Sequence, residues 1–270
     1  MAKVIHLVTS PCQTCGVPGR FSGEIVRLIQ DSLDYANSAN LGGALISLDQ
    51  EKAFDRVDWQ FLNHVLLRMN FGIYSRILIN GALGCPFSVS RGVRQGCPLS
   101  PLLYILAAEP LSRAVQESPD IHGFPSPDGN IVKILQYADD TTCFVTEDAS
   151  LCCSRAVFDR YATAMGAKLN LDKTEGLLFS SWKSSTDLPI PVKWTSESLN
   201  ILGCRVGNDI LPDWDSLVKK FKVKITAWNK RTLSLQGRTL LANTLGLSIF
   251  WYQATIFDMP KTLEIGRAHV

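Results

Sequence analysis

Apolar residues in the first part of the chain alternate between helical spacing and short continuous runs. Over residues 21–37 they recur every three to four positions, which predicts a helix. Residues 44–48 form a short apolar run that ends at Asp49, a pattern typical of a buried strand. Asp58 precedes a second stretch with helical spacing and is predicted to be its N-cap. The pattern therefore predicts a helix, a strand and another helix in this order.

The middle of the chain continues with a helix, a pair of strands and a further helix. Ser100 followed by Pro101 predicts a helix start, with the serine as cap and the proline at the first helical position. Two apolar strands, 131–137 and 141–145, flank a short acidic turn. Helical spacing returns over about residues 149–165.

The last part of the chain is mainly helical. Residues 180–191 are rich in serine and proline and are predicted to be a linker, whereas 199–206 have the pattern of a strand or hairpin. Because strands and helices do not alternate regularly, the order favours an α+β fold over a doubly wound sheet.

Composition is that of a globular protein, with 46% hydrophobic and 19% charged residues in a chain of 270. The net charge of +2 does not by itself indicate a nucleic-acid partner. Its distribution is more informative, because residues 216–257 contain no acidic residue. The basic residues of this stretch are Lys219, Lys220, Lys222, Lys224, Lys230, Arg231 and Arg238. Such a basic stretch is typical of a surface that faces phosphates.

Several classes of protein are disfavoured. The chain is longer than the small domains that depend on disulfides, and Cys12 and Cys15 have no second pair at zinc-binding spacing. There is no apolar run of 18 residues and no signal-peptide pattern, so we expect an intracellular, reducing location without membrane contact. Dinucleotide-binding, P-loop and hydrolase motifs do not occur.

The acidic turn formed by Asp139 and Asp140 is the main candidate for chemistry. Alone, two acids between strands are more typical of an exposed turn. Asp49, at the end of another strand, changes this interpretation because three neighbouring carboxylates repel unless a divalent cation neutralises them. Oxygen ligands suit Mg²⁺, and two such ions would activate an attacking hydroxyl and stabilise a leaving phosphate oxygen. Spacing does not establish that the fold unites these acids.

These acids belong to a series of motifs in a fixed order. The segments are LISLDQEKAFDRVDW at 45–59, GVRQGCPLSPLLY at 92–104, YADD at 137–140, LNLDKTE at 169–175 and LG at 202–203. In this order they resemble the five palm motifs of reverse transcriptases of non-LTR (LINE-type) retrotransposons. Residues 228–238 resemble the start of the thumb, and Gln13 with residues 17–20 resembles the segment that leads into the palm. The resemblance covers about residues 3–258.

The resemblance implies a right-hand polymerase fold whose palm is an antiparallel sheet backed by helices. It divides the chain into partial fingers with a lead-in helix (1–43), a palm (44–206), the start of a helical thumb (207–258) and a tail (259–270). The tail matches nothing in the family, and we expect it to be foreign to the natural element. We also expect the chain to be a fragment that lacks most of the fingers.

The implied activity is RNA-directed DNA synthesis, in which a primer 3′-hydroxyl attacks a deoxynucleoside triphosphate (dNTP). The partners would be an RNA template, a DNA primer, the dNTP and the element RNA as a ribonucleoprotein, in the cytoplasm and nucleus. Asp49 and Asp139 would bind two Mg²⁺ ions, with Mn²⁺ as an alternative. Asp140 and the Gln50 carbonyl would support them.

The resemblance also implies nucleotide-binding residues. Phe54 occupies the position of a steric gate that rejects the ribose 2′-hydroxyl; the alternative is a core aromatic residue. The turn with Arg94, Gln95 and Gly96 would approach the templating base and the nucleotide, since glycine leaves room for the backbone; the alternative is an ordinary strand-to-helix turn. Lys173 would protonate the departing pyrophosphate, and a solvated surface lysine is the alternative.

The thumb region is predicted to be an amphipathic helix. Its apolar face would carry Phe221, Ile225 and Trp228, and its basic face Lys220, Lys224 and Arg231. The basic face would follow the template–primer backbone in a salt-dependent way. A solvated charged face is the alternative.

Two further interpretations stay open. One is a catalytically inactive, truncated remnant that only binds nucleic acid. The other is a different palm polymerase, of the group II intron or telomerase type; residues 56–59 (RVDW) after 53–55 (AFD) favour the LINE-type branch over it.

Overall fold

The computed structural model describes most of the chain. The residues outside the description are 1–4, 66–72, 80, 94–95, 127–128, 186–187, 209, 211, 229–230 and 262–270. The predictions for Arg94 and Gln95 therefore lie outside the described residues.

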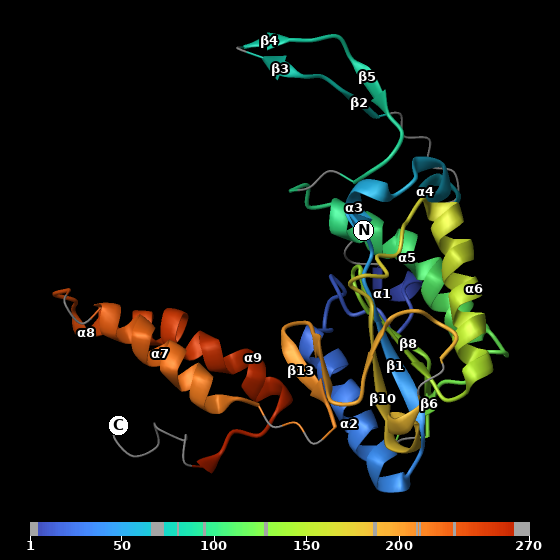
Figure 1. Cartoon of the computed structure of the whole chain (residues 1–270). Coiled ribbons are helices and arrows are strands. Elements are labelled where there is room, and N and C mark those ends of the chain that lie inside the picture. The colour runs from blue at the N-terminus through green and yellow to red at the C-terminus, as the bar shows by residue number, and fades with distance from the viewer. Residues whose placement is uncertain are drawn as a thin grey trace.

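Helices and strands alternate irregularly along the chain (Figure 1). The helices are α1 (Ile5–Val8), α2 (Ser22–Ala39), α3 (Ala53–Arg56), α4 (Trp59–Val65), α5 (Ser100–Glu117), α6 (Asp148–Met165), η1 (Ser180–Ser184), α7 (Trp214–Trp228), α8 (Leu235–Leu241), η2 (Ala242–Leu247) and α9 (Ser248–Ile256). The strands are β1 (Gly43–Leu48), β2 (Ile73–Ser75), β3 (Leu78–Ile79), β4 (Ala82–Leu83), β5 (Phe87–Val89), β6 (Phe124–Pro125), β7 (Ile131–Val132), β8 (Ile134–Tyr137), β9 (Asp140–Val145), β10 (Glu175–Phe179), β11 (Lys193–Thr195), β12 (Ser198–Ile201) and β13 (Cys204–Gly207).

The central sheet has five strands in the order β11-β10-β1-β9-β8. Strand β1 pairs antiparallel with both β9 and β10, and β8 pairs antiparallel with β9. Only the edge pair β10–β11 is parallel among the pairings of this sheet that the structure describes. The predicted α+β class is confirmed, and the sheet is antiparallel as expected apart from that edge.

The two faces of the sheet are covered by different helices. Along β1, Ile46 faces the cluster formed with α5 and α6, where Tyr104 and Phe158 are buried. Leu45 faces the opposite cluster, which contains residues of α2 and of the β12–β13 hairpin. Alternate side chains of a strand point to opposite faces, so the continuous apolar run of β1 fills two cores.

Helix α2 packs on the sheet. Ile29 and Leu33 are fully buried against it. Gln30 hydrogen bonds α2 to β13: its Nε2 donates to Gly207 O at 3.1 Å, and its Oε1 accepts from Gly207 N–H at 3.2 Å. The helix predicted over residues 21–37 is therefore confirmed, and it is built into the same core as the sheet.

Most of the predicted elements are present, with two corrections. Asp58 caps α4 as expected, since its Oδ1 accepts from the N–H groups of Gln60 and Phe61. Helix α5 begins at Ser100, one position earlier than predicted, so Leu99 occupies the N-cap position. The predicted linker 180–191 is part of the core, because it contains η1 and the buried Ile190.

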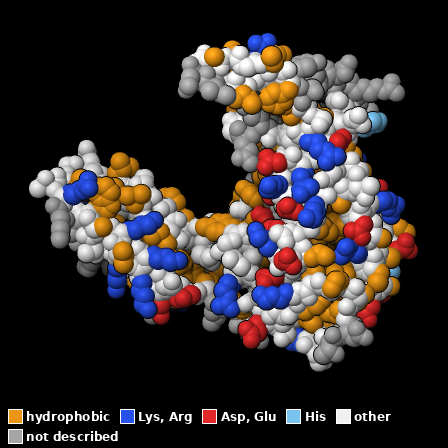
Figure 2. Space-filling view, turned by 45° about the horizontal axis from the view of Figure 1, so that its top comes forward, with side chains coloured by type: hydrophobic (Ala, Val, Ile, Leu, Met, Phe, Trp, Pro, Cys, Tyr) orange, Lys and Arg blue, Asp and Glu red, His pale blue; other side chains and the backbone are white. Residues whose placement is uncertain are grey.

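Two projections extend from the central sheet and its helices. Strands β2 to β5 form a hairpin arm on one side, and α7, α8, η2 and α9 form a helical lobe on the other (Figure 1). An open space separates the arm from the lobe, with the sheet-bearing body at its base (Figure 2). The division into fingers, palm, thumb and tail stays a prediction. Within the described ranges, no helix combines the length and apolarity that crossing a membrane requires.

Candidate active site

The fold brings Asp49 next to the acidic turn. In the antiparallel register of β1 and β9, Leu48 lies opposite Thr141. Asp49 follows Leu48 and Asp140 precedes Thr141, so the two acids continue the ladder at the same end of the sheet. Figure 1 shows β1 reaching α3 at this end, below the hairpin arm.

The β8–β9 turn that carries the other two acids is tight. Tyr137 pairs with Asp140, which leaves Ala138 and Asp139 as the loop. Ala138 has φ of 54°, in the left-handed region that residues with a side chain rarely adopt, and it is only 8% exposed. The backbone therefore needs support from outside the hairpin to hold this conformation.

The acids are placed in an environment that disfavours their charge. Burial, followed by the neighbouring Asp49, raises the pKa of Asp139, although its own backbone N–H opposes the shift. Burial, then Asp139 and Asp49, raises the pKa of Asp140. A divalent cation would relieve both effects, since it supplies the missing positive charge.

The donor set suits a hard divalent cation. The three side chains offer only carboxylate oxygens, the ligands that Mg²⁺ prefers, and none of them forms an ion pair with a described lysine or arginine. Within the described ranges, no group of three His, Cys, Asp or Glu side chains is arranged to hold a metal. Their assignment as ligands stays a prediction.

The turn that carries Lys173 is hydrogen bonded to the backbone of Asp49. Asn170 N–H donates to Asp49 O at 2.9 Å, and Asp49 N–H donates to Thr174 Oγ1 at 3.3 Å. Lys173 itself is exposed. The structure thus brings the predicted lysine's turn beside the candidate site.

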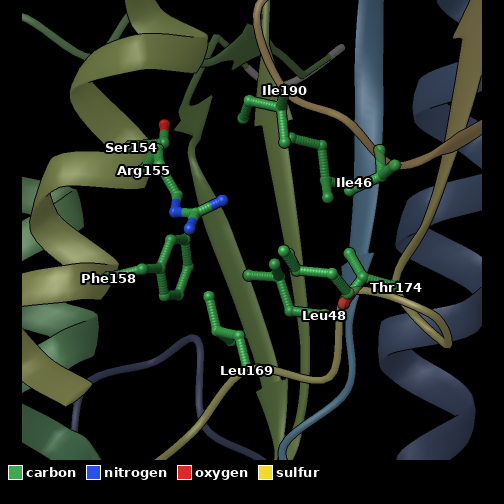
Figure 3. Close-up of a pocket in the computed structure, with 10 residues that line it drawn as sticks. Ile46, Leu48, Ser154, Arg155, Phe158, Leu169, Thr174 and Ile190 are labelled. Carbon is green, nitrogen blue, oxygen red and sulfur yellow. The ribbon is translucent and has the colours of Figure 1, made fainter.

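An apolar pocket lies behind this end of the sheet, between β1 and α6 (Figure 3). Leu48 and Ile46 line it from β1, Phe158 from α6, and Leu169 and Thr174 from the turn bound to Asp49. Its lining is mainly apolar, with Ser154, Arg155 and Thr174 as the polar members, so we interpret it as a packing surface behind Asp49.

Phe54 rests on an aromatic support. Its ring lies 4.4 Å from that of Tyr104, with an interplanar angle of 24°. Tyr104 is fully buried, and its hydroxyl donates to Gln50 Oε1 at 3.3 Å. Burial chiefly raises the pKa of Tyr104, so the hydroxyl stays a donor. The stack connects Phe54 to the residue that follows Asp49.

The chain before the glycine turn is attached to α3. Val93 N–H donates to Phe54 O at 2.8 Å, and Gly92 N–H to Val57 O at 2.9 Å. Gly92 has φ of 87°, and an added Cβ would lie 3.1 Å from Asp55 O, so glycine is required. Gly96 has φ of 82° with open space around it. Gly92 and Val93, which precede the turn, therefore lie close to Phe54.

Helix α7 is amphipathic, as predicted. Phe221 packs on Phe250 of α9, with ring centroids 5.7 Å apart, whereas Lys220 and Lys224 are exposed. The placement of Arg231 was wrong: α7 ends at Trp228, so Arg231 lies beyond the helix. Its guanidinium carbon is 4.5 Å from the centroid of the Trp228 ring, a cation–π contact.

Sequence reasoning missed the support beneath these residues. Tyr104 lies within the second motif, but nothing in its spacing indicated a contact with Phe54. Gln136 is 1% exposed next to the acidic turn, and only its place in an apolar strand distinguished it. Gln13 was noted for its family position, without a role.

A central antiparallel pair of strands with acids at one end, covered by helices on both faces, is the architecture of a polymerase palm. The chain matches the family described as reverse transcriptase (RNA-dependent DNA polymerase) over residues 16–206. This range covers more than half of the chain, so the chain belongs to the reverse transcriptase family.

The relatives are proteins of mobile elements. The chain is 34% identical to the "Transposon TX1 uncharacterized 149 kDa protein" of Xenopus laevis, over 94% of this chain and 20% of that protein. It is 27% identical to the "Retrovirus-related Pol polyprotein from type-1 retrotransposable element R2" of Popillia japonica, over 48% of this chain and 20% of that one. These similarities confirm the resemblance to non-LTR retrotransposon reverse transcriptases. The chain spans about a fifth of the length of both relatives.

Among solved structures, telomerase of Candida tropicalis truncated from its C-terminal domain is similar with a TM-score of 0.49 and 13% identity. The match covers 73% of this chain and 39% of the telomerase chain.

Proposed function

We propose that this chain contains the catalytic palm of an RNA-directed DNA polymerase of a non-LTR retrotransposon. The observation that supports this most is the β1–β9 register, which puts Asp49 and Asp140 at the same end of the sheet. The raised pKa values of Asp139 and Asp140 indicate an acidic centre prepared for a cation.

In this proposal Asp49 and Asp139 bind two divalent cations, with Asp140 and the Gln50 carbonyl in support. Bound Mg²⁺ or Mn²⁺ supplies the charge that activates the primer hydroxyl and stabilises the departing pyrophosphate. The oxygen of the primer 3′-hydroxyl forms a bond to the α-phosphate of the dNTP as the bond to pyrophosphate breaks. Asp49 and Asp139 hold the reacting groups in line.

Phe54 and Lys173 act on the nucleotide. The Phe54 ring, held from below by Tyr104, blocks the space that a ribose 2′-hydroxyl needs. Lys173, on the turn bound to Asp49, donates a proton to the leaving pyrophosphate. Gln95 and Gly96, with Arg94, lie against the templating base and the nucleotide.

The helical lobe binds the nucleic acid in this proposal. Lys220 and Lys224 project from α7, whose other face packs in the lobe, and Arg231 lies beyond its end. Contacts of lysine and arginine with phosphates give affinity without sequence preference. The partners are an RNA template and a DNA primer, and the element RNA would complete a ribonucleoprotein.

Primer extension on an RNA template with Mg²⁺ and dNTPs tests the proposal. Asp139→Asn should lower incorporation about a thousandfold or more, because a lost metal ligand removes several kcal/mol of transition-state stabilisation. Asp120→Asn is the matched control: this exposed acid follows α5, at the end of that helix away from Tyr104. Wild-type-like incorporation by Asp139→Asn contradicts the ligand assignment. Template binding without extension by the unsubstituted chain favours the inactive remnant instead.

A further inference from the structure

The segment before α2 extends the central sheet beside the acidic turn. Strand β8 is an edge strand, and Gln13 forms a parallel bridge with Gln136 on it. Thr14 N–H donates to Gln136 O at 3.0 Å, and Gln136 N–H donates to Cys12 O at 2.8 Å. Residues 12–14 therefore act as a short additional strand at the edge nearest Asp139.

The Gln13 side chain reaches from this strand into the turn. It is 1% exposed, and its Oε1 accepts from Ala138 N–H at 3.2 Å and from Cys15 N–H at 2.9 Å. Ala138 is the left-handed residue immediately before Asp139. Gln13 thus supplies, from a distant segment, an acceptor for the N–H of the strained residue.

A second glutamine holds the other side of the same turn. Gln136 Nε2 donates to Thr141 Oγ1 at 3.2 Å, and Thr141 Oγ1 donates to Asp139 O at 3.4 Å. Ser112 of α5 donates to Gln136 Oε1, which orients this amide. Ala138 N–H is thereby bonded directly to one buried amide, and the Asp139 carbonyl is linked to a second one through the Thr141 hydroxyl.

The Gln13 backbone is itself anchored. Arg20 Nη1 donates to Gln13 O at 2.6 Å and to Ser10 O at 2.7 Å. The buried carboxylate of Glu109 on α5 accepts from Ser10 N–H at 2.9 Å and 3.0 Å. The acceptor aimed at Ala138 therefore sits on a rigid support.

The amide nitrogen of Gln13 argues against a role in stability alone. Gln13 Nε2 is buried and has no hydrogen-bond partner among the described residues. An unpaired buried donor disfavours folding, so an amide at this position is costly unless its acceptor is needed. An apolar side chain of similar length would avoid that cost, and would leave Ala138 N–H without its partner.

We propose that Gln13 is a positioning residue of the reverse transcriptase site: by accepting the Ala138 N–H it holds the left-handed backbone of the turn from which Asp139 and Asp140 would bind the metal. The inference deepens the proposed function, on which it rests. Gln13 does not touch the reacting atoms and acts through the turn. Groups that orient metal ligands from outside are typically worth about 10–100-fold in metal affinity or activity.

The test compares Gln13→Met with Thr14→Val. Methionine keeps the length of the side chain and removes the acceptor. Thr14→Val removes the neighbouring buried hydroxyl, which forms no hydrogen bond with any described residue. Three quantities are measured: hydrogen exchange of the Ala138 amide, Mn²⁺ affinity from the free-ion EPR signal, and the Mg²⁺ dependence of incorporation.

In Gln13→Met we expect faster exchange of the Ala138 amide, with the β1–β9 ladder amides still protected as a check of folding. Mn²⁺ affinity should fall, and the half-saturating Mg²⁺ concentration should rise, by about tenfold or more. Thr14→Val should match the wild type in all three. Unchanged metal affinity in a folded Gln13→Met overturns the proposal, because a merely structural residue would lower stability alone.

A measurement on the unsubstituted protein covers the case in which Gln13→Met does not fold. Coupling between sites is reciprocal, so Mg²⁺ should slow the exchange of the Ala138 amide. No change on adding Mg²⁺ overturns the inference. Absence of incorporation by the wild type, with the exchange and Mn²⁺ results as expected, counts against the proposed activity and leaves the role of Gln13 intact.

Discussion

The acidic end of the central sheet and the α7–α9 lobe are built by different physical means. At the sheet end, Asp49, Asp139 and Asp140 are placed by strand register and by hydrogen bonds with two separate segments, around Thr174 and around Gln13. In the lobe, Lys220 and Lys224 are exposed side chains on one helix. In the proposed function, chemistry at the first site depends on atomic positions, and binding at the second depends on the sum of charges.

This difference has a consequence for substitutions. A shift of about 1 Å at a catalytic group can lower the rate about a hundredfold. Loss of one phosphate-facing lysine weakens binding modestly and similarly for all sequences. Changes in the palm should therefore alter selectivity and rate, and changes in the lobe should alter affinity and its dependence on salt.

After Asp139→Asn, Phe54→Val should have the largest effect. Removing the ring that blocks the 2′-hydroxyl should lower the preference for dNTPs over ribonucleotides by about 10–200-fold, the range for a lost pocket contact. Single-nucleotide incorporation with each substrate gives the ratio of kcat/KM values. Phe61→Leu, which alters an aromatic of α4 packed on Tyr161, serves as control. An unchanged ratio would mean that Phe54 is only a core aromatic.

The double variant Lys220→Gln, Lys224→Gln should weaken template–primer binding by about tenfold and flatten the salt dependence. The slope of log Kd against log salt should fall by up to about 0.9 for each lost phosphate contact. Filter binding at several salt concentrations measures both. Lys222→Gln, on the opposite face of α7, is the matched control and should change little. Equal effects of all three lysines would indicate a diffuse solvated surface.

Tyr104→Leu should shift selectivity less than Phe54→Val, by a few-fold. The Phe54 ring stays in place but loses the support stacked 4.4 Å away. Tyr104 is fully buried, so the substitution should also cost about 3 kcal/mol in the free energy of unfolding. Tyr104→Phe keeps the stacked ring and removes only the hydroxyl that donates to Gln50. Comparing the two variants therefore distinguishes the effect of stacking from that of the hydrogen bond. Wild-type selectivity in a folded Tyr104→Leu would show that Phe54 needs no support.

The smallest expected effect is a dependence of stability on pH. Since the pKa values of Asp139 and Asp140 are raised in the folded chain, it binds more protons than the unfolded chain does. The metal-free protein should lose stability as pH rises from the ordinary aspartate value of about 4 through the raised pKa values. Asp139→Asn should reduce this loss.

Melting temperature in EDTA and in Mg²⁺ across this pH range is the measurement, with shifts of about 2–4 °C expected. Stabilisation by Mg²⁺ should grow with pH, because only ionised carboxylates bind the metal. A stability curve in EDTA that rises with pH in this range would contradict the shifts.

Much of the palm could be predicted because its signals are local. The helix α2, the strand before Asp49 and the hairpin around Asp139 follow from periodicity and turn residues. The start of α5 was misplaced by one residue, since helix starts depend on backbone geometry that the cap sequence only biases. The serine- and proline-rich stretch 180–191 was misjudged because Ile190 and Trp182 pack in the core.

The sequence alone determined the acids, their order and the family, because these depend on residue identity and on motifs contiguous in the chain. Only the tertiary structure decided that Asp49 continues the ladder beside Asp140, that Tyr104 lies under Phe54 and that Gln13 holds Ala138. Each of these pairs joins segments far apart in the chain. Their contact depends on strand register and helix packing, which local propensity does not encode.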